Sequence, residues 1–162
     1  MPGTPTLRRA RPADWDAIHA LLLGSALPVD DLGRDRLGRF LVAESSGAIL
    51  GFIGLEAYGT IGLLRSLVVE ESARGSGLGG RLIGALEAAA ATAGIVELWL
   101  LTLDAERFFQ RHDYQIVARS LAPDVIRRTD EFSGLCPDTA VLMRKSPPQS
   151  VASSEDRVAQ DP

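Results

Sequence analysis

The sequence has too little of several residue types to fit some large protein classes. It contains one cysteine in 162 residues, which excludes an internal disulfide. Its 17 basic residues stand against 21 acidic ones, and the formal charge of −4 excludes the broad positive field of a non-specific nucleic-acid binder. No apolar run approaches the roughly 18 residues of a membrane span, and no signal-peptide pattern opens the chain. We therefore expect a cytoplasmic protein without a nucleic-acid or membrane partner.

The remaining composition predicts one globular domain. Hydrophobic residues make up 46% of the chain and charged residues 23%, which allows a core without metal or disulfide support. We place this single domain at residues 1–145. Residues 146–162 contain three prolines, few apolar side chains and no periodicity, so we expect a disordered tail.

The hydrophobic pattern predicts strands and helices in a mixed α/β order. Asp14 is expected to cap a helix that places Trp15, Ile18 and Leu22 on one face. Strand 95–102 lacks apolar alternation, which is typical of a central or parallel strand reached by a helical crossover. The expected strands are 6–9, 40–44, 49–55, 63–69, 95–102, 114–119 and 139–144, with the second to fourth as an antiparallel meander. Short helices are expected over 104–111 and 123–129.

A glycine-rich loop is the strongest motif. Residues 74–80 are Arg-Gly-Ser-Gly-Leu-Gly-Gly, between a buried strand and the start of a helix that ends at Gly94. Uncovered N–H groups, the helix dipole and the arginine would form an anion site, with Gly77 and Gly79 letting a phosphate approach the backbone. A glycine-rich turn without a ligand is the alternative. The missing lysine excludes a Walker loop, and the preceding antiparallel strands exclude a Rossmann loop.

The segment from Arg74 to Gly79 resembles the Arg/Gln-x-x-Gly-x-Gly/Ala signature of the GCN5-related N-acetyltransferase (GNAT) superfamily. The order of elements agrees with that family over roughly residues 6–144. The resemblance implies a seven-stranded mixed, mostly antiparallel sheet with splayed central strands and flanking helices. It also implies acetyl-CoA as co-substrate, lying in the wedge between those strands, and it leaves a homodimer open.

The same resemblance implies the contacts of the cofactor. The backbone of Leu67 and Val69 would pair with the pantetheine arm, and the N–H groups of residues 75–80 would hold the pyrophosphate. The N–H at or near Leu67 would act in catalysis by stabilising the oxyanion of the reacting acetyl group. The implied cofactor-binding residues are Leu67, Val68, Val69, Arg74, Gly75, Ser76, Gly77, Leu78, Gly79, Gly80 and Phe108.

Glu56 is the predicted general base. It lies near the end of an apolar strand, where burial would raise its pKa toward the useful range. An exposed glutamate on the outer strand face is the alternative. The family's Ala-x-x-x-Tyr pattern, whose tyrosine protonates the departing thiolate, here ends in Phe109. Tyr58 is a candidate substitute, although packing at the sheet rim is the favoured role for it.

Further segments resemble the arsenic-resistance N-acetyltransferase subgroup: 54–59, 63–67, 108–111 and 126–132 with 135–137. This implies an amino-acid-like or arsenic-bearing amine as substrate, in detoxification. Arg65 would bind a substrate anion or, as slightly favoured, pair internally with Glu56. Arg127 would bind a substrate carboxylate or arsenical oxyanion, and Glu131 a substrate ammonium. The candidate substrate-binding residues are Tyr58, Arg65, Ser66, Thr102, Arg127 and Glu131.

No metal site is predicted. His19 and His112 lack partners at metal-ligand spacing, and Cys136 beside a proline is interpreted as a buried small hydrophobe. A non-catalytic acyl-CoA-binding regulatory domain of the same fold is the alternative function, because the usual acid is absent. A protein-modifying acetyltransferase is a third option, which the predicted covering segment 123–137 disfavours.

Overall fold

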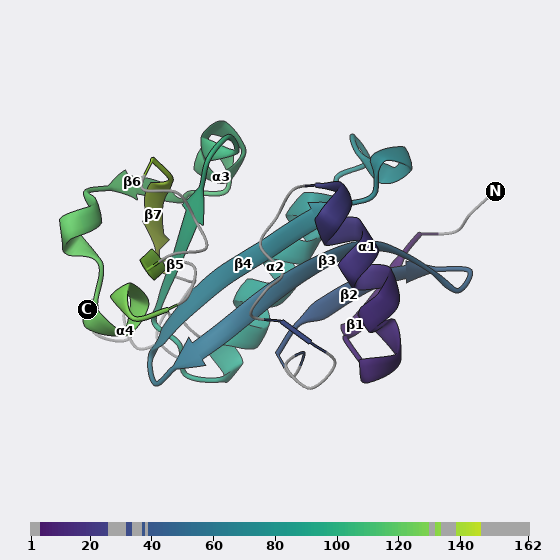
Figure 1. The fold of residues 1–162 in the computed structure, drawn as a ribbon, viewed down its shortest axis with the longest axis horizontal. Coiled ribbons are helices and arrows are strands. Elements are labelled where there is room, and N and C mark those ends of the chain that lie inside the picture. Colours follow the sequence, from purple (N-terminus) through teal and green to yellow (C-terminus); the bar gives the residue numbers. More distant parts are fainter. Residues whose placement is uncertain are drawn as a thin grey trace, which may run out of the picture.

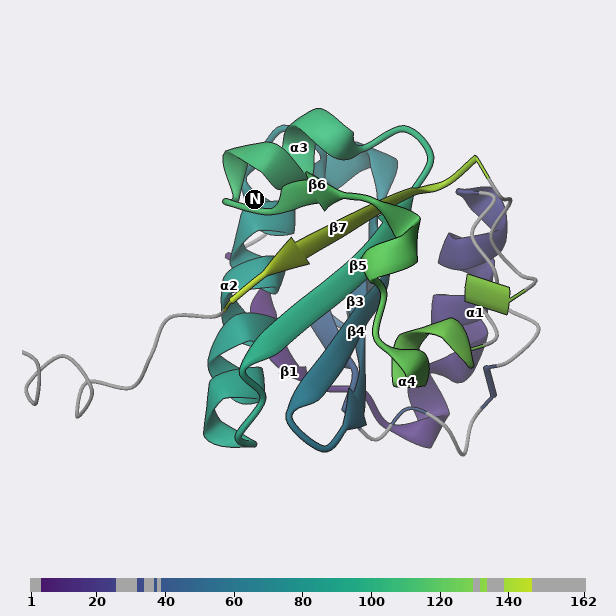
Figure 2. The same ribbon diagram turned by 90° about the vertical axis from the view of Figure 1, so that its left-hand side faces the viewer.

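The computed structural model describes residues 4–25, 32–33, 37, 39–129, 132–133 and 139–146. They form a single seven-stranded sheet with helices on both faces (Figure 1 and Figure 2). Of the predicted tail only Ser146 is described, and Glu131 and Cys136 lie outside the described residues. In chain order the elements, with short 3-10 helices labelled η, are β1 Thr6–Arg9, η1 Pro12–Asp14, α1 Trp15–Gly24, β2 Leu41–Ser45, β3 Ala48–Tyr58, β4 Ile61–Val69, η3 Glu71–Ala73, α2 Leu78–Thr92, β5 Glu97–Thr102, α3 Glu106–Arg111, β6 Gln115–Val117, η4 Arg119–Leu121, α4 Asp124–Arg127 and β7 Val141–Lys145.

The sheet has the strand order β1-β2-β3-β4-β5-β7-β6. Strands β4 and β5 pair in parallel, and the other neighbouring strands pair antiparallel. Helix α2 connects the two parallel strands, as a crossover must. The predicted meander, the parallel buried strand and the mixed, mostly antiparallel sheet are therefore confirmed.

The two central strands separate along their length. Parallel pairing joins Ile61–Leu63 to Glu97–Trp99 and is not continued by the later described residues of either strand. Strand β4 nevertheless continues to Val69 and β5 to Thr102. The parts of β4 and β5 that are no longer paired with each other border a wedge, and its vertex lies at Leu63. The predicted splay of the two central strands is therefore confirmed.

Strand β4 also contains a bulge beside the wedge. Arg65 pairs with Gly54 and Val68 with Phe52, so Ser66 and Leu67 together oppose one residue of β3. Ser66 has a φ of 61°, a left-handed conformation that costs a residue with a side chain about 1 kcal/mol or more. The extra residue changes the direction of β4 and shifts which backbone groups face the wedge.

Two helices bury the two faces of the sheet. Helix α2 packs Leu82, Ile83 and Leu86 against β2, β3 and β4 and forms the main core. Helix α1 packs Ile18 and Leu22 against the other face, and in Figure 1 it lies in front of the strands while α2 lies behind them. Each helix buries only one apolar stripe, as the spacing of its leucines and isoleucines predicts.

The predicted cap of α1 is wrong. The Asp14 side chain makes no cap hydrogen bond to α1. Its carboxylate turns back instead, and accepts hydrogen bonds from the Arg11 N–H (2.7 Å) and from both terminal nitrogens of Arg8 (2.8 and 2.9 Å). A guanidinium within reach offers a carboxylate two charged donors, which outcompete a neutral helix N–H.

A smaller cluster packs α4 onto the sheet near the wedge vertex. Ile126 of α4 contacts the group formed by Leu63, Trp99 and Leu142. Figure 2 shows α4 lying against β4 and β5. Among the described residues, no helix has the length and apolar character needed to cross a membrane.

Candidate active site

Two glycines turn the chain from β4 into α2. Gly75 and Gly77 have φ values of 79° and 84°, which only glycine adopts without strain. Gly77 is the residue immediately before α2. Their conformation brings the backbone of residues 75–80 around the start of the helix.

The N–H groups of this loop are available to a ligand. The Ala73 and Arg74 N–H groups turn back to the carbonyls of Glu70 and Glu71, and the next donor along the chain is Arg81, which bonds the Gly77 carbonyl (3.1 Å). Among the described residues, no backbone carbonyl accepts the N–H groups of residues 75–80. Together with the positive end of the α2 dipole, they fit the diphosphate of a nucleotide cofactor.

Gly79 and Gly80 serve packing between helices as well. A Cβ atom on Gly79 would lie 3.1 Å from Cζ of Phe108, and one on Gly80 would lie 3.0 Å from Cε1 of His112. From the sequence, Gly79 is attributed to the close approach of a ligand. The structure adds a second reason, because Phe108 of α3 occupies the space next to a Cβ atom at this position. Phe108 thus lies beside the loop, where it was predicted. The position of His112 was missed, because nothing in its local sequence places it next to α2.

Arg74 lies at the rim of the loop. Its side chain is exposed, and its Nε donates to the Val69 carbonyl (3.0 Å) at the end of β4. Glu70 accepts hydrogen bonds from the Ser72 N–H and hydroxyl, which lower the pKa of this exposed carboxyl. Neither Leu67 nor Val69 is paired to β5, so backbone groups of both residues border the wedge.

Glu56 is part of a partly buried ionic network. Its carboxylate accepts one hydrogen bond from the Tyr58 hydroxyl (2.5 Å) and one from Nη1 of Arg65 (2.9 Å). The Arg65 side chain is 0% exposed and Glu56 24% exposed. Nε of Arg65 donates to the Ser66 hydroxyl (3.0 Å). The internal pair that was favoured for Arg65 is confirmed, since a fully desolvated guanidinium requires such partners.

The register of the sheet places this network at the vertex of the wedge. Glu56 pairs across the sheet with Leu63, the last β4 residue joined to β5. Tyr58 and Phe132 both pack against the cluster that contains Ile126, so the segment around α4 covers the same face of the sheet. The predicted rim position of Tyr58 is compatible with this contact. The hydrogen bond to Glu56 was not predicted, although an i, i+2 spacing on a strand places two side chains on one face.

The position of the usual acid is confirmed to be apolar. Phe109 is 6% exposed and packs in the main core. Its neighbour Tyr114 does not replace the acid, because its hydroxyl donates to the buried Glu87 carboxylate (3.0 Å). Burial and the charge of Glu87 raise the pKa of Tyr114.

Other candidate substrate residues have structural partners. The Thr102 hydroxyl accepts the Ala105 N–H (3.1 Å) and so holds the turn that leads to α3. Arg127 donates from Nε to the Ala122 carbonyl (3.0 Å) and from Nη2 to the Ser120 carbonyl. No cluster of three metal-ligating side chains occurs in the part of the chain that the structure describes.

Comparison with known sequences identifies the family. Residues 36–116, half of the 162 residues, match the acetyltransferase (GNAT) domain model. The chain is also 33% identical over 137 residues to an uncharacterized N-acetyltransferase of Chlorobaculum tepidum, covering 79% of this chain and 87% of that protein. The chain therefore belongs to the GNAT family of acetyltransferases.

Solved structures show the same fold. N-acetylglutamate synthase from Neisseria gonorrhoeae, complexed with coenzyme A and N-acetyl-glutamate, matches with a TM-score of 0.79 and 19% identity over 91% of this chain. The chain spans only 36% of that protein. A Mycobacterium tuberculosis protein in complex with CoA matches with a TM-score of 0.75 and 23% identity, over 88% of this chain and 99% of the other.

An aminoglycoside 6'-N-acetyltransferase complexed with coenzyme A also matches, with a TM-score of 0.68, 20% identity and coverage of 90% and 98%. The family membership, the loop geometry and these CoA complexes agree. The chain is an acetyl-CoA-dependent N-acetyltransferase, and the predictions of an enzyme and of its co-substrate are confirmed.

Proposed function

We propose that the acceptor is the amine of a small amino-acid-like molecule, and that arsenic-bearing amino acids belong to this class in a detoxification role. The observation that carries the proposal is the Glu56 carboxylate, which Arg65 and Tyr58 fix at the wedge vertex while part of it stays exposed. The Neisseria gonorrhoeae neighbour, complexed with N-acetyl-glutamate, supports an amino-acid acceptor. The resemblance to the arsenic-resistance subgroup supports the arsenic-bearing members.

Glu56 would prepare the amine for attack. An amine is an ammonium ion at neutral pH and must lose a proton before it becomes a nucleophile. A carboxylate held by two donors keeps a fixed orientation, and its exposed edge would accept that proton directly or through one water molecule. Acetyl-CoA, when bound, supplies the acetyl group as an activated thioester. The Leu67 N–H, on the unpaired part of β4, would polarise the acetyl carbonyl.

Arg127 would recognise the carboxylate or oxyanion of the acceptor. Its hydrogen bonds to two carbonyls use two of the five N–H donors of a guanidinium. These bonds fix the side chain on α4, whose Ile126 packs in the same cluster as Tyr58. Arg65 would then act as a positioning residue through Glu56, while Tyr58, Ser66, Thr102 and Glu131 stay proposed contacts of the acceptor.

The test is a thiol-release assay with a panel of amines at fixed acetyl-CoA. The panel contains glutamate-like amino acids, arsenic-bearing amino acids, their decarboxylated amines and simple alkyl amines. We expect turnover with acceptors that carry both an amine and an acidic group. Equal turnover with the decarboxylated amines would contradict the proposed acceptor class.

The Arg127→Gln variant tests the recognition of the acidic group. Loss of a charged hydrogen bond of about 1.5–3 kcal/mol predicts a rise in KM for the acceptor of about tenfold or more. The KM for acetyl-CoA should not change. Arg128→Gln, at the next residue, is the matched control. An acceptor KM that is the same in Arg127→Gln and the parent enzyme would exclude this role.

A further inference from the structure

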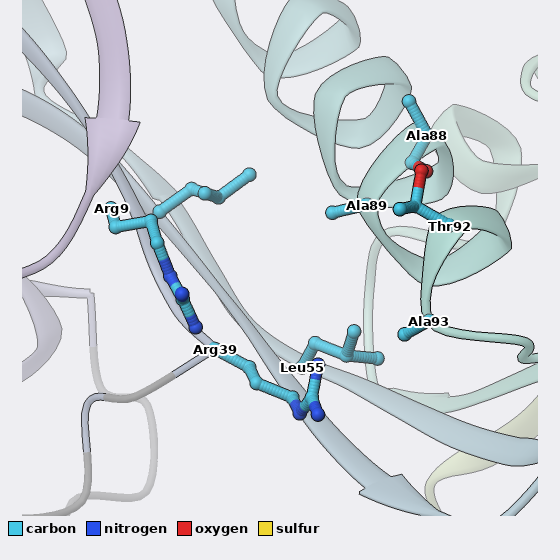
Figure 3. Close-up of a pocket in the computed structure, with 8 residues that line it drawn as sticks. Arg9, Arg39, Leu55, Ala88, Ala89, Thr92 and Ala93 are labelled. Atoms are coloured by element: carbon cyan, nitrogen blue, oxygen red, sulfur yellow. The ribbon is translucent and has the colours of Figure 1, made fainter.

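A pocket lies between the sheet and the C-terminal turns of α2 (Figure 3). It has a volume of about 520 Å³, within the range of roughly 300–1,000 Å³ that is typical of small-molecule sites. Its lining includes two arginines, Arg9 and Arg39, and two leucines, Leu41 and Leu55. The last turns of α2, around Ala89, form the opposite wall.

The two arginines give the pocket a positive end. Figure 3 shows both side chains on the sheet side of the pocket, across from α2. Arg9 has an interaction partner of its own, so the inference depends on Arg39. Arg39 is exposed and forms no ion pair with another described residue. The planar guanidinium of Arg39 therefore offers charged donors to an oxyanion at this end of the pocket.

The remaining wall of the pocket is apolar. Leu41 and Leu55 line it from the sheet, and the alanines of α2 leave the space open because their side chains are small. The Thr92 hydroxyl donates to the Ala88 carbonyl (3.0 Å), so it is left with acceptor capacity only. An apolar wall beside a guanidinium group suits a ligand with an anionic head and a short hydrocarbon body.

We infer that this pocket binds a small aliphatic carboxylate at a site separate from the acetyl-CoA wedge. The carboxylate contacts Arg39 and Arg9, and the hydrocarbon packs on Leu41, Leu55 and Ala89. Ala89 is ten residues from Gly79, which at 1.5 Å per residue separates the pocket from the start of α2 by about 15 Å. Leu55 and Glu56 point to opposite faces of β3, so the new site and the Glu56 network lie on different sides of the sheet.

The test is calorimetric titration of hexanoate into the full chain saturated with CoA, so that binding in the wedge does not contribute. Hexylamine, 1-hexanol and inorganic phosphate are titrated in parallel. We expect binding of hexanoate only, because the amine reverses the charge, the alcohol lacks it and phosphate lacks the hydrocarbon body. Amide chemical shifts should change around residues 39–41, 55 and 88–93.

Matched variants locate the binding. Ala89→Phe fills the pocket and should abolish hexanoate binding, whereas Ala91→Phe, at an exposed α2 position that does not line the pocket, should retain it. Arg39→Gln should weaken binding about tenfold or more, the loss expected for one charged hydrogen bond. Arg107→Gln, an exposed arginine on α3, should have no effect.

Three results would overturn the inference. The first is no heat and no shift changes with hexanoate in a protein that still binds CoA. The second is hexanoate binding that Ala89→Phe and Arg39→Gln leave unchanged. The third is equal binding of inorganic phosphate or hexylamine, which would show that the pocket does not select an anion with a hydrocarbon body.

Discussion

The proposed acetyl-CoA side and the proposed acceptor side of the active site use different chemical groups. On the proposed acetyl-CoA side the binding groups would be backbone N–H groups, because no backbone carbonyl of the described residues accepts those of residues 75–80. On the proposed acceptor side they would be side chains, since Glu56 accepts hydrogen bonds from both Tyr58 and Arg65.

This difference determines how each side responds to change. A backbone site depends on the path of the chain, so it is sensitive to φ and tolerant of most side-chain replacements. A side-chain network in a desolvated place depends on every member, because removing one partner leaves another charge uncompensated. Substitutions on the two sides should therefore separate cofactor binding from turnover.

The largest expected effect is that of Glu56→Gln on turnover. General base catalysis contributes about 10²–10⁴-fold, so we expect kcat to fall by about 100-fold or more at neutral pH. Acetyl-CoA binding, measured by thermal shift, should be unchanged because the glycine loop is intact. Glu106→Gln is the control, because it removes the same charge on α3, outside the Glu56 network. A parent-like kcat in Glu56→Gln would remove Glu56 from the reaction.

Asp14→Asn tests whether an ionic pair outside the active site affects stability only. Hydrogen bonds from Arg8 and the Arg11 N–H lower the pKa of Asp14, and the variant should lose about 2 kcal/mol of unfolding free energy at neutral pH. A lowered folded-state pKa gives stability that is present above the unfolded pKa of about 3.9 and is lost as the pH falls through the folded value. The difference between variant and parent should therefore shrink below about pH 4, as measured by urea denaturation, while kcat stays unchanged. A constant difference across that range would contradict the assignment.

The sequence predicts the backbone side of the site well for physical reasons. Few backbone geometries require so many glycines just before a helix, and a loop with left-handed residues is one of them. Gly75 and Gly77 do adopt the left-handed conformation. The hydrophobic pattern likewise predicts the meander, and the lack of apolar alternation in residues 95–102 predicts the parallel strand, because burial determines both patterns. Segment 123–137 is expected to cover the substrate side, and the packing of Ile126 and Tyr58 in one cluster agrees with that.

The sequence predicts the side-chain side less well. Whether Arg65 meets Glu56 or a substrate depends on the register of β3 and β4, which pairs Gly54 with Arg65 and Glu56 with Leu63. No local pattern indicates that register, nor the positive φ of Ser66 that follows it. Asp14 was expected to cap a helix, but Arg8, on a neighbouring strand, offers stronger donors. In both cases a partner in another element, six residues away for Asp14 and nine for Arg65, decides what the charged group does.

Gly77→Ala should have a smaller effect, and on the acetyl-CoA side alone. An alanine at a φ of 84° costs about 1–2 kcal/mol, so we expect that loss of stability together with weaker acetyl-CoA binding. Gly84→Ala is the matched control, because Gly84 lies within α2, is exposed and has open space around its Cα. That control should gain about 0.5–1 kcal/mol, as expected for glycine replaced in a helix. Equal effects of the two substitutions in thermal unfolding would mean that the loop conformation is not what matters.

Arg74→Ala is expected to have the smallest effect on stability and a measurable one on the cofactor. Its guanidinium is exposed and donates to a single carbonyl. Without acetyl-CoA, the unfolding free energy should therefore change by less than about 0.5 kcal/mol. At about 100 times its Kd, acetyl-CoA adds roughly 2.7 kcal/mol to the parent, a rise on the order of 5–10 °C in Tm. The variant should show a smaller rise at the same ligand concentration, and Arg107→Ala should match the parent. Because the loop N–H groups remain, the shift should be reduced and not lost; a complete loss would show that the side chain at the rim, rather than the backbone, carries the binding.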